Sequence, residues 1–199
     1  MNKKELFYIS NQLSLLRFIL LILCIYILVS SIEHKFLISA GIIFLIWLSD
    51  ILDGYFARKR NEITELGKII DPLADKLTII SIALVLLMQG LIPLWFLIII
   101  ALRDLLIFSG GIYIKNKHHI VLASNWAGKA AAFLIGFTLF ISVIIAGLKE
   151  EKNIISFYHI ENVELYYQGL ILLCIVMSII SLIFYFKRFA SLNTEKANI

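Results

Sequence analysis

The sequence predicts an all-α integral membrane protein with six membrane-spanning helices. Of the 199 residues, 61% are hydrophobic and only 16% are charged, whereas soluble domains average about 45–50% apolar and about 25% charged residues. The apolar residues form runs long enough for the ~20 residues with which a helix crosses a bilayer. The predicted spans cover residues 14–32, 36–57, 72–89, 92–114, 125–148 and 165–186.

The first span follows a mixed segment, 1–13, in which Lys3 and Lys4 precede several apolar residues. One interpretation is an amphipathic segment that lies on the membrane surface before the span. The other is an ordinary helix start, in which Arg17 extends its charged end to the interface. The run lacks a small-x-small cleavage site and is long enough to span, so it is interpreted as a retained helix.

The remaining spans are separated by two short turns, at 33–35 and 90–93, and by longer polar loops at 58–71, 115–124 and 149–164. Residues 187–199 are predicted to be a cytoplasmic tail. No repeat, low-complexity segment or linker divides the chain, so we expect one membrane domain over residues 1–199.

Lysine and arginine counts predict the orientation of the spans. Eleven of these residues fall on one side and three, Lys35, Lys149 and Lys152, on the other. Because the basic side of a membrane protein faces the cytoplasm, both termini and the 58–71 loop are expected there. The basic side holds Lys3, Lys4, Arg58, Lys59, Arg60, Lys68, Lys115, Lys117, Lys187, Arg188 and Lys196.

The net charge of +4 is mild, and no basic face is interleaved with aromatic residues. A lipid bilayer is therefore the expected partner, and nucleic acid is not. Cys24 and Cys174 lie within apolar runs and are expected to be buried small apolar residues, with no disulfide or metal between them. His118 and His119 lie in a basic loop and are expected to be solvated.

Four aspartates interrupt this apolar chain at the predicted end of the second span and start of the third. Asp50 and Asp53 are three residues apart, and Asp71 and Asp75 are four apart, so each pair shares one face of a helix. Pro72 suits a first-turn position. Because a short loop joins antiparallel neighbours, the two acid faces are expected to point at each other. Such a set of hard oxygen ligands suits Mg²⁺ or Mn²⁺, with two ions plausible.

Small residues accompany the acids. Gly54 lies in an apolar helix, where glycine costs about 1 kcal/mol relative to alanine, so a close approach by a ligand or another backbone is the natural reason for it. Ala57 is equally small, Arg58 can bind a phosphate, and Gly67 lies in the loop before Asp71. Together these residues suggest a metal-bridged pyrophosphate on a lipid. The alternative is a salt-bridged loop with clustered interfacial acids.

The pattern D-x₂-D-G-x₂-A-R-x₈-G-x₃-D-x₃-D, which runs from Asp50 to Asp75, resembles the signature of the CDP-alcohol phosphatidyltransferase family without departure. The resemblance implies a six-helix membrane domain, usually a homodimer, with a polar cavity open to the cytoplasm. It implies transfer of a phosphatidyl group from CDP-diacylglycerol to an alcohol, with release of CMP. Residue usage rich in Ile, Lys and Asn suggests a bacterial inner membrane.

The resemblance also implies roles for single residues. Asp50, Asp53 and Asp71 are similar to the family's main metal ligands, and Asp75 to a ligand of the second metal. Asp75 is also the implied base for the acceptor hydroxyl. The implied CDP-binding positions are Asp50, Gly54, Ala57, Arg58 and Gly67.

The acceptor alcohol is less specified. The segment GKIIDPLADKL, and Asn11 with Arg17 in SNQLSLLR, resemble phosphatidylglycerophosphate synthases and the related cardiolipin synthases. Arg103-Asp104 is closer to the cardiolipin type, and Ala130-Ala131 stands where Lys-Thr is common. Glycerol-3-phosphate is the preferred acceptor, with phosphatidylglycerol and an inositol phosphate as alternatives.

Acceptor phosphate is expected to bind Arg103, Lys129 and Lys76, since an intramembrane arginine marks function by default. The alternative for Arg103 is an ion pair with Asp104 or between helices, which holds the bundle together. Outside the enzyme class, a divalent-cation transporter would need acids near mid-membrane with a path to both sides. A lipid-binding or scaffold protein would not need the paired acid spacing.

Overall fold

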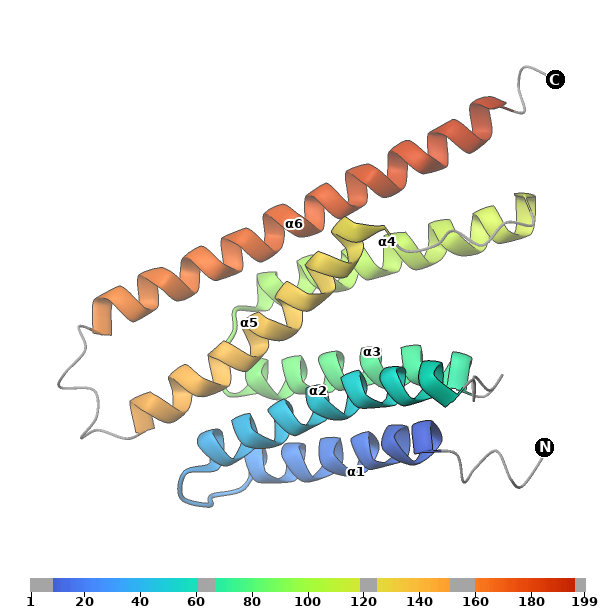
Figure 1. Ribbon diagram of the computed structural model, residues 1–199. Coiled ribbons are helices and arrows are strands. Elements are labelled where there is room, and N and C mark those ends of the chain that lie inside the picture. Colours follow the sequence, from blue (N-terminus) through green and yellow to red (C-terminus); the bar gives the residue numbers. More distant parts are fainter. Residues whose placement is uncertain (1–8, 61–66, 119–124, 151–159, 196–199) are drawn as a thin grey trace. The chain divides into compact units, whose positions relative to one another are not determined.

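The computed structural model describes residues 9–60, 67–118, 125–150 and 160–195. Only the helical backbone, and not the side chains, is described for residues 9–11, 14, 53–60, 67–74, 118, 160–162 and 192–195. The described residues form six helices joined without strands, as the sequence predicts (Figure 1). They are α1 (Ile9–Val29), α2 (Lys35–Arg60), α3 (Gly67–Met88), α4 (Leu94–His118), α5 (Trp126–Glu150) and α6 (Ile160–Glu195).

Four of the helices contain apolar segments long enough to cross a membrane. These segments are Lys35–Leu52, Leu94–Lys117, Trp126–Glu150 and Val163–Ser191, and α1 has a shorter apolar segment, Leu15–Val29. Large apolar side chains such as Ile22, Met88 and Leu172 are more than 60% exposed, as expected of surfaces that face lipid. The protein is therefore an integral membrane protein. Six spans, with both termini in the cytoplasm, stay a prediction.

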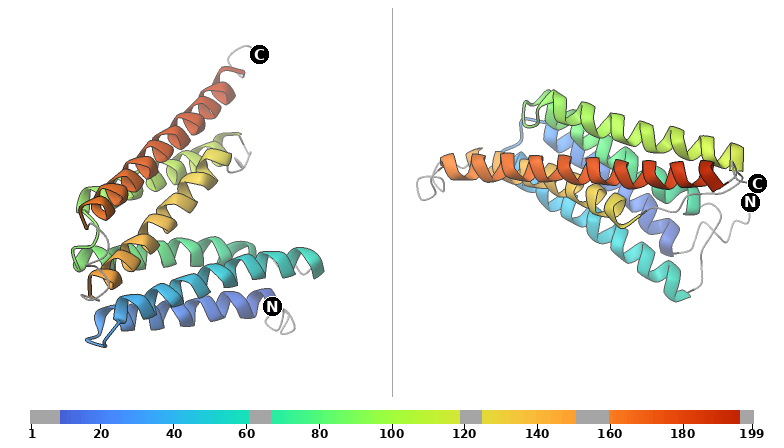
Figure 2. Two further views of the ribbon diagram at one scale, coloured as in Figure 1. Left: turned by 60° about the vertical axis from the view of Figure 1, so that its left-hand side comes forward. Right: turned by 90° about the horizontal axis from the view of Figure 1, so that it is seen from above.

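Contacts divide the chain into two compact units, the first being Met1–Leu91 with Ser142–Tyr158 and the second Ile92–Ile141 with His159–Ile199. The expectation of one membrane domain over residues 1–199 stays a prediction. In the first unit, α1 packs against both α2 and α3. Figures 1 and 2 show these three helices side by side, with α2 antiparallel to the other two.

Most of the buried side chains among the described residues are apolar, and the polar ones are mainly serine and threonine. Leu21, Cys24 and Leu28 of α1 are at most 5% exposed and face the core of the first unit. In the second unit α4 packs against α6. Cys174 of α6 is fully buried, and both cysteines are free thiols, so the expectation of buried, unpaired cysteines is confirmed.

The predicted turn at 90–93 is confirmed, and its hydrogen bonds explain why α3 stops. Gly90 adopts φ +71°, a left-handed conformation that glycine adopts without steric cost. Its N–H donates to the carbonyl of Leu87, and the N–H of Leu91 donates to the carbonyl of Leu86, both at 2.9 Å. These two bonds form a Schellman motif, which satisfies carbonyl groups at the helix end.

Several helix ends differ from the predicted spans because polar residues can extend a helix beyond the hydrocarbon. α3 begins at Gly67, so Gly67 is the first residue of a helix and not part of a loop. Pro72 is then the sixth residue, one turn further in than predicted. A proline at this position lacks the N–H that would bond the carbonyl of Lys68, so one backbone bond is missing early in the helix.

Two other helices also extend further than predicted. α4 ends at His118, which therefore closes a helix, while His119 lies outside the described residues. α6 runs through the start of the predicted tail to Glu195. At the N-terminus, residues 9–13 belong to the same continuous helix as the first span, which fits the ordinary helix start. Residues 1–8 of the predicted amphipathic segment lie outside the described part of the chain.

The close approach of α5 to the start of α2 predicts a cost for enlarging Gly147. A Cβ atom at Gly147 would lie 2.8 Å from Cδ2 and 3.3 Å from the backbone nitrogen of Leu37. We expect Gly147→Leu to destabilise the protein by about 1–3 kcal/mol through overpacking, measured by thermal unfolding in detergent. Gly41→Leu is the matched control, because nothing lies within 4 Å of a Cβ there. Equal losses for both variants would contradict the proposed packing.

Candidate active site

One buried arginine joins two of the four signature acids. Nη2 of Arg17 in α1 lies 2.7 Å from Oδ1 of Asp50 in α2. Nη1 of the same side chain donates to Oδ1 of Asp75 in α3, at 2.5 Å. Three helices therefore contribute one residue each to this charged cluster. A planar guanidinium that binds two carboxylates makes short, charge-assisted hydrogen bonds.

The position of Arg17 differs from one of the two interpretations of the first helix. Its side chain is 1% exposed, so its charged end is buried against the two acids and does not extend to solvent. It continues the buried stripe of Leu21, Cys24 and Leu28, at spacings of four, three and four residues. The signal was present in this register, since an arginine on the buried face of an apolar helix needs an anionic partner.

The remaining signature residues lie on α2 and α3, the helices that carry Asp50 and Asp75. In α2, the helical register places Asp53, Gly54 and Ala57 on the face that begins with Asp50, and the helix continues through Arg58 to Arg60. In α3, Gly67, Asp71 and Asp75 follow at intervals of four. The side chains of all these residues except Asp50 and Asp75 lie outside the described part of the structure, so their contacts stay predictions.

The two described acids offer oxygen atoms to solvent or a ligand. The side chains of Asp50 and Asp75 are 50% and 49% exposed, in contrast to the buried arginine between them. Among the described side chains, no group of three or more His, Cys, Asp or Glu residues gathers to hold a metal ion. That set includes only two of the four predicted ligands, so the metal site stays a prediction.

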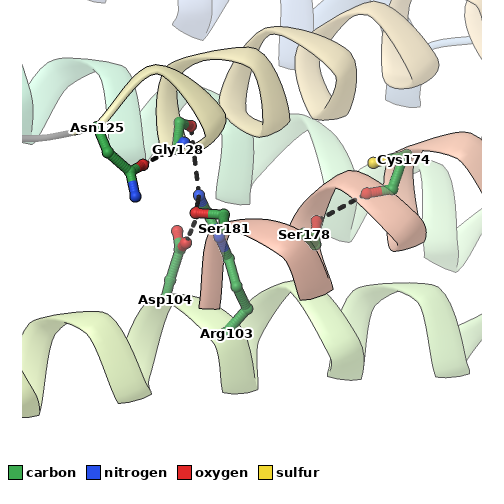
Figure 3. A network of polar contacts seen from close by, with 7 residues as sticks. All are labelled: Arg103, Asp104, Asn125, Gly128, Cys174, Ser178 and Ser181. Atoms are coloured by element: carbon green, nitrogen blue, oxygen red, sulfur yellow. Dashed lines mark hydrogen bonds and ion pairs between the residues drawn. The ribbon is translucent and has the colours of Figure 1, made fainter. Parts of the chain in front are cut away.

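A second buried arginine joins three helices in the second unit (Figure 3). Arg103 in α4 is 7% exposed. Its Nη1 donates to Oδ1 of Asp104 at 2.7 Å, and its Nη2 donates to Oγ of Ser181 in α6 at 3.2 Å and to the carbonyl of Gly128 in α5 at 3.3 Å. The Arg103–Asp104 ion pair is thus present, as one of the two predicted alternatives has it.

The start of α5 is fixed by a side-chain cap. Oδ1 of Asn125 accepts a hydrogen bond from the N–H of Gly128 at 2.6 Å, as an N-cap residue does for the first turn of a helix. This cap holds the carbonyl that Arg103 reaches. Lys129, the next residue, is exposed, and Lys76 in α3 is exposed as well. Both lysines are therefore accessible, and their predicted role in acceptor binding is not tested by these contacts.

The Arg103 contacts predict unequal costs for two substitutions. Arg103→Gln removes the hydrogen bonds that the guanidinium donates to Asp104, Ser181 and Gly128. We expect it to lower the free energy of unfolding by about 2–3 kcal/mol, as for buried hydrogen bonds to a charged group. Asp104→Asn keeps an acceptor oxygen on a side chain that is 40% exposed, so we expect a loss below about 1 kcal/mol. Thermal unfolding in detergent, followed by tryptophan fluorescence, compares them. Equal losses would show that the ion pair alone holds Arg103.

Comparison with known proteins identifies one family and relatives with two different names. The family model of CDP-alcohol phosphatidyltransferase matches residues 7–180. A Mycoplasma pneumoniae protein named CDP-diacylglycerol--glycerol-3-phosphate 3-phosphatidyltransferase is 35% identical over 119 residues, which are 59% of this chain and 52% of that protein. An Aquifex aeolicus protein of the same name is 41% identical over 113 residues, 55% of this chain and 61% of its own.

Another relative carries a different name. A Mycobacterium tuberculosis protein named putative cardiolipin synthase is 28% identical over 131 residues, 65% of this chain and 62% of that protein. The matches thus span about half to three fifths of the length of these curated relatives. The family model covers well over half of the chain and includes both acid-bearing helices. The chain belongs to the CDP-alcohol phosphatidyltransferase family.

Proposed function

We propose that this protein transfers a phosphatidyl group from CDP-diacylglycerol to an alcohol and releases CMP. The observation that carries the proposal is the cluster of Asp50 and Asp75, which come from two signature-bearing helices and meet at Arg17. The signature by itself does not require that its two acid pairs, on α2 and α3, lie close together in space. Here both acids lie at the same end of the three-helix unit, which favours retained chemistry.

We propose that two divalent ions, Mg²⁺ or Mn²⁺, bind to four aspartates: Asp50, Asp53, Asp71 and Asp75. The donor set fits such ions, because carboxylate oxygens are the ligands that hard divalent cations prefer. Half-exposed carboxylates at Asp50 and Asp75 fit a site that a soluble ion must enter. When bound, such ions neutralise the negative charge that a pyrophosphate carries and develops as it is cleaved.

The chain's own residues divide the remaining tasks. Gly54, Ala57 and Gly67 leave room for the cytidine nucleotide to lie against the helices, together with Asp50, and Arg58 binds its phosphates. Asp75 takes the proton from the acceptor hydroxyl as general base. The acceptor oxygen then forms a bond to the phosphorus of the phosphatidyl group, and the bond from that phosphorus to the CMP oxygen breaks.

We propose glycerol-3-phosphate as the acceptor, and the names of the Mycoplasma and Aquifex relatives support this choice. Arg103, Lys129 and Lys76 are the proposed phosphate ligands. Nε of Arg103 is buried and has no hydrogen-bond partner among the described residues, so it retains a donor. Phosphatidylglycerol is the second candidate, because other relatives are named cardiolipin synthases, and Arg103-Asp104 is closer to that type.

The proposed setting is a bacterial inner membrane, with the acids at its cytoplasmic side and the protein as a homodimer. Eleven basic residues on the side of the acids support this orientation. A site at headgroup level lets the acyl chains of the donor stay in the bilayer during transfer. A divalent-cation transporter is the competing class, and it would move cations across vesicles without consuming CDP-diacylglycerol.

The activity is tested by CMP release from CDP-diacylglycerol with purified protein in detergent. We expect release that requires Mg²⁺ or Mn²⁺ and is greatest with glycerol-3-phosphate, in a panel with phosphatidylglycerol, inositol phosphate and serine. Greater release with phosphatidylglycerol would assign the cardiolipin type. If no acceptor supports release in folded protein that still binds CDP, the proposed reaction is wrong.

Asp75→Asn tests the general base. An amide cannot take the acceptor proton, so we expect kcat to fall by on the order of 10²–10⁴-fold, measured in the same assay. Glu164→Gln is the matched control, since Glu164 is an exposed acid of α6 outside the signature, and it should leave kcat unchanged. Near-normal turnover in Asp75→Asn at saturating metal would remove Asp75 from this role.

A further inference from the structure

We propose that Arg17 is a positioning residue, which holds the carboxylates of Asp50 and Asp75 in the arrangement that binds the divalent cations. The proposal rests on the proposed function for the identity of these cations. It assigns a role to a residue outside the acid signature and on a different helix. Arg17 does not touch the substrate in this role; it acts through the two acids.

The burial of Arg17 makes it suited to fix other side chains. It is 1% exposed and lies in the stripe that continues through Leu21, Cys24 and Leu28, which is the face that packs against the rest of the first unit. A packed side chain has few alternative rotamers, so its guanidinium keeps one position. Functional groups are held precisely when the residues around them are locked by packing and hydrogen bonds.

The geometry ties two separate helices to this fixed point. One terminal nitrogen of Arg17 binds Asp50 of α2 at 2.7 Å, and the other binds Asp75 of α3. Because the two nitrogens belong to one rigid planar group, they set the spacing between the two carboxylates. A lysine in the same place carries one nitrogen and the same charge, so it cannot reproduce that spacing.

Two physical effects of Arg17 on a cation have opposite signs. Its positive charge repels a nearby cation, which alone would make removal of Arg17 strengthen cation binding. Its hydrogen bonds orient the carboxylates, and loss of such outer partners typically weakens metal binding by about 10–100-fold. Both carboxylates remain half-exposed and outnumber the single positive charge between them. We therefore expect orientation to outweigh repulsion.

The test measures Mn²⁺ binding directly, with no substrate present. Mn²⁺ is titrated into the purified full-length protein in detergent, and free Mn²⁺ is measured by its EPR signal. We expect Arg17→Gln to weaken binding by about 10–100-fold. Arg17→Lys keeps the positive charge but not the two terminal nitrogens of the guanidinium, so its Mn²⁺ affinity should lie between those of Arg17→Gln and the wild type.

Gln89→Ala is the matched control. Nε2 of Gln89, just after α3, donates to the carbonyl of Leu28 in α1 at 2.5 Å, so it also links α1 to α3 through a polar contact. Leu28 is eleven residues, about three helical turns, from Arg17. The control should lower thermal stability without changing Mn²⁺ affinity.

Each outcome decides the proposal. Unchanged or tighter Mn²⁺ binding in Arg17→Gln would overturn it, and so would equal weakening in Gln89→Ala or a wild type that binds no Mn²⁺. If Arg17→Gln fails to fold, Arg17→Lys decides: weaker binding supports positioning, and wild-type affinity contradicts it. CMP release from the same preparations separates the two proposals. Arg17-dependent Mn²⁺ binding without CMP release from any acceptor would leave positioning intact and overturn the proposed reaction.

Discussion

The cost of burying a positive charge determines which residues meet in the first unit. Arg17 is almost completely buried, and a buried guanidinium is stable only with anionic or hydrogen-bonding partners. Asp50 and Asp75 supply those partners from two different helices. The same ion pairs that compensate the arginine therefore hold the C-terminal half of α2 beside the N-terminal half of α3, and these two segments carry the signature.

The second unit also contains a buried arginine that links three helices, but its partners differ. Arg103 is its buried arginine, and it reaches Asp104 on its own helix, Ser181 on α6 and the first turn of α5. Among the described side chains, these two arginines are the charged residues that the protein buries. Each links three helices through directional bonds. In a bilayer, where apolar packing gains little from excluding water, such bonds help to specify which helices meet.

The two arginines differ in what surrounds their partners. Asp50 and Asp75 are half-exposed and part of a dense set of acids along the sequence, so the Arg17 cluster retains excess negative charge. The terminal nitrogens of Arg103 donate to one carboxylate and two neutral oxygens, so this cluster has no excess negative charge. A cation is thus favoured near the Arg17 cluster, whereas the charges of Arg103 and Asp104 balance each other.

The sequence by itself determined the all-α membrane class, the turn at Gly90 and the acid signature, because hydropathy, glycine conformation and helical spacing are local properties. One of its two interpretations left the charged end of Arg17 exposed, whereas that side chain is buried, and Gly67, predicted in a loop, begins α3. Only the tertiary structure decided that Arg17 joins Asp50 to Asp75, and that Arg103 pairs with Asp104 while bonding to α5 and α6. The physical reason is that a buried charge selects its partners through space, from residues as far apart as positions 17 and 75, and no local pattern encodes that choice.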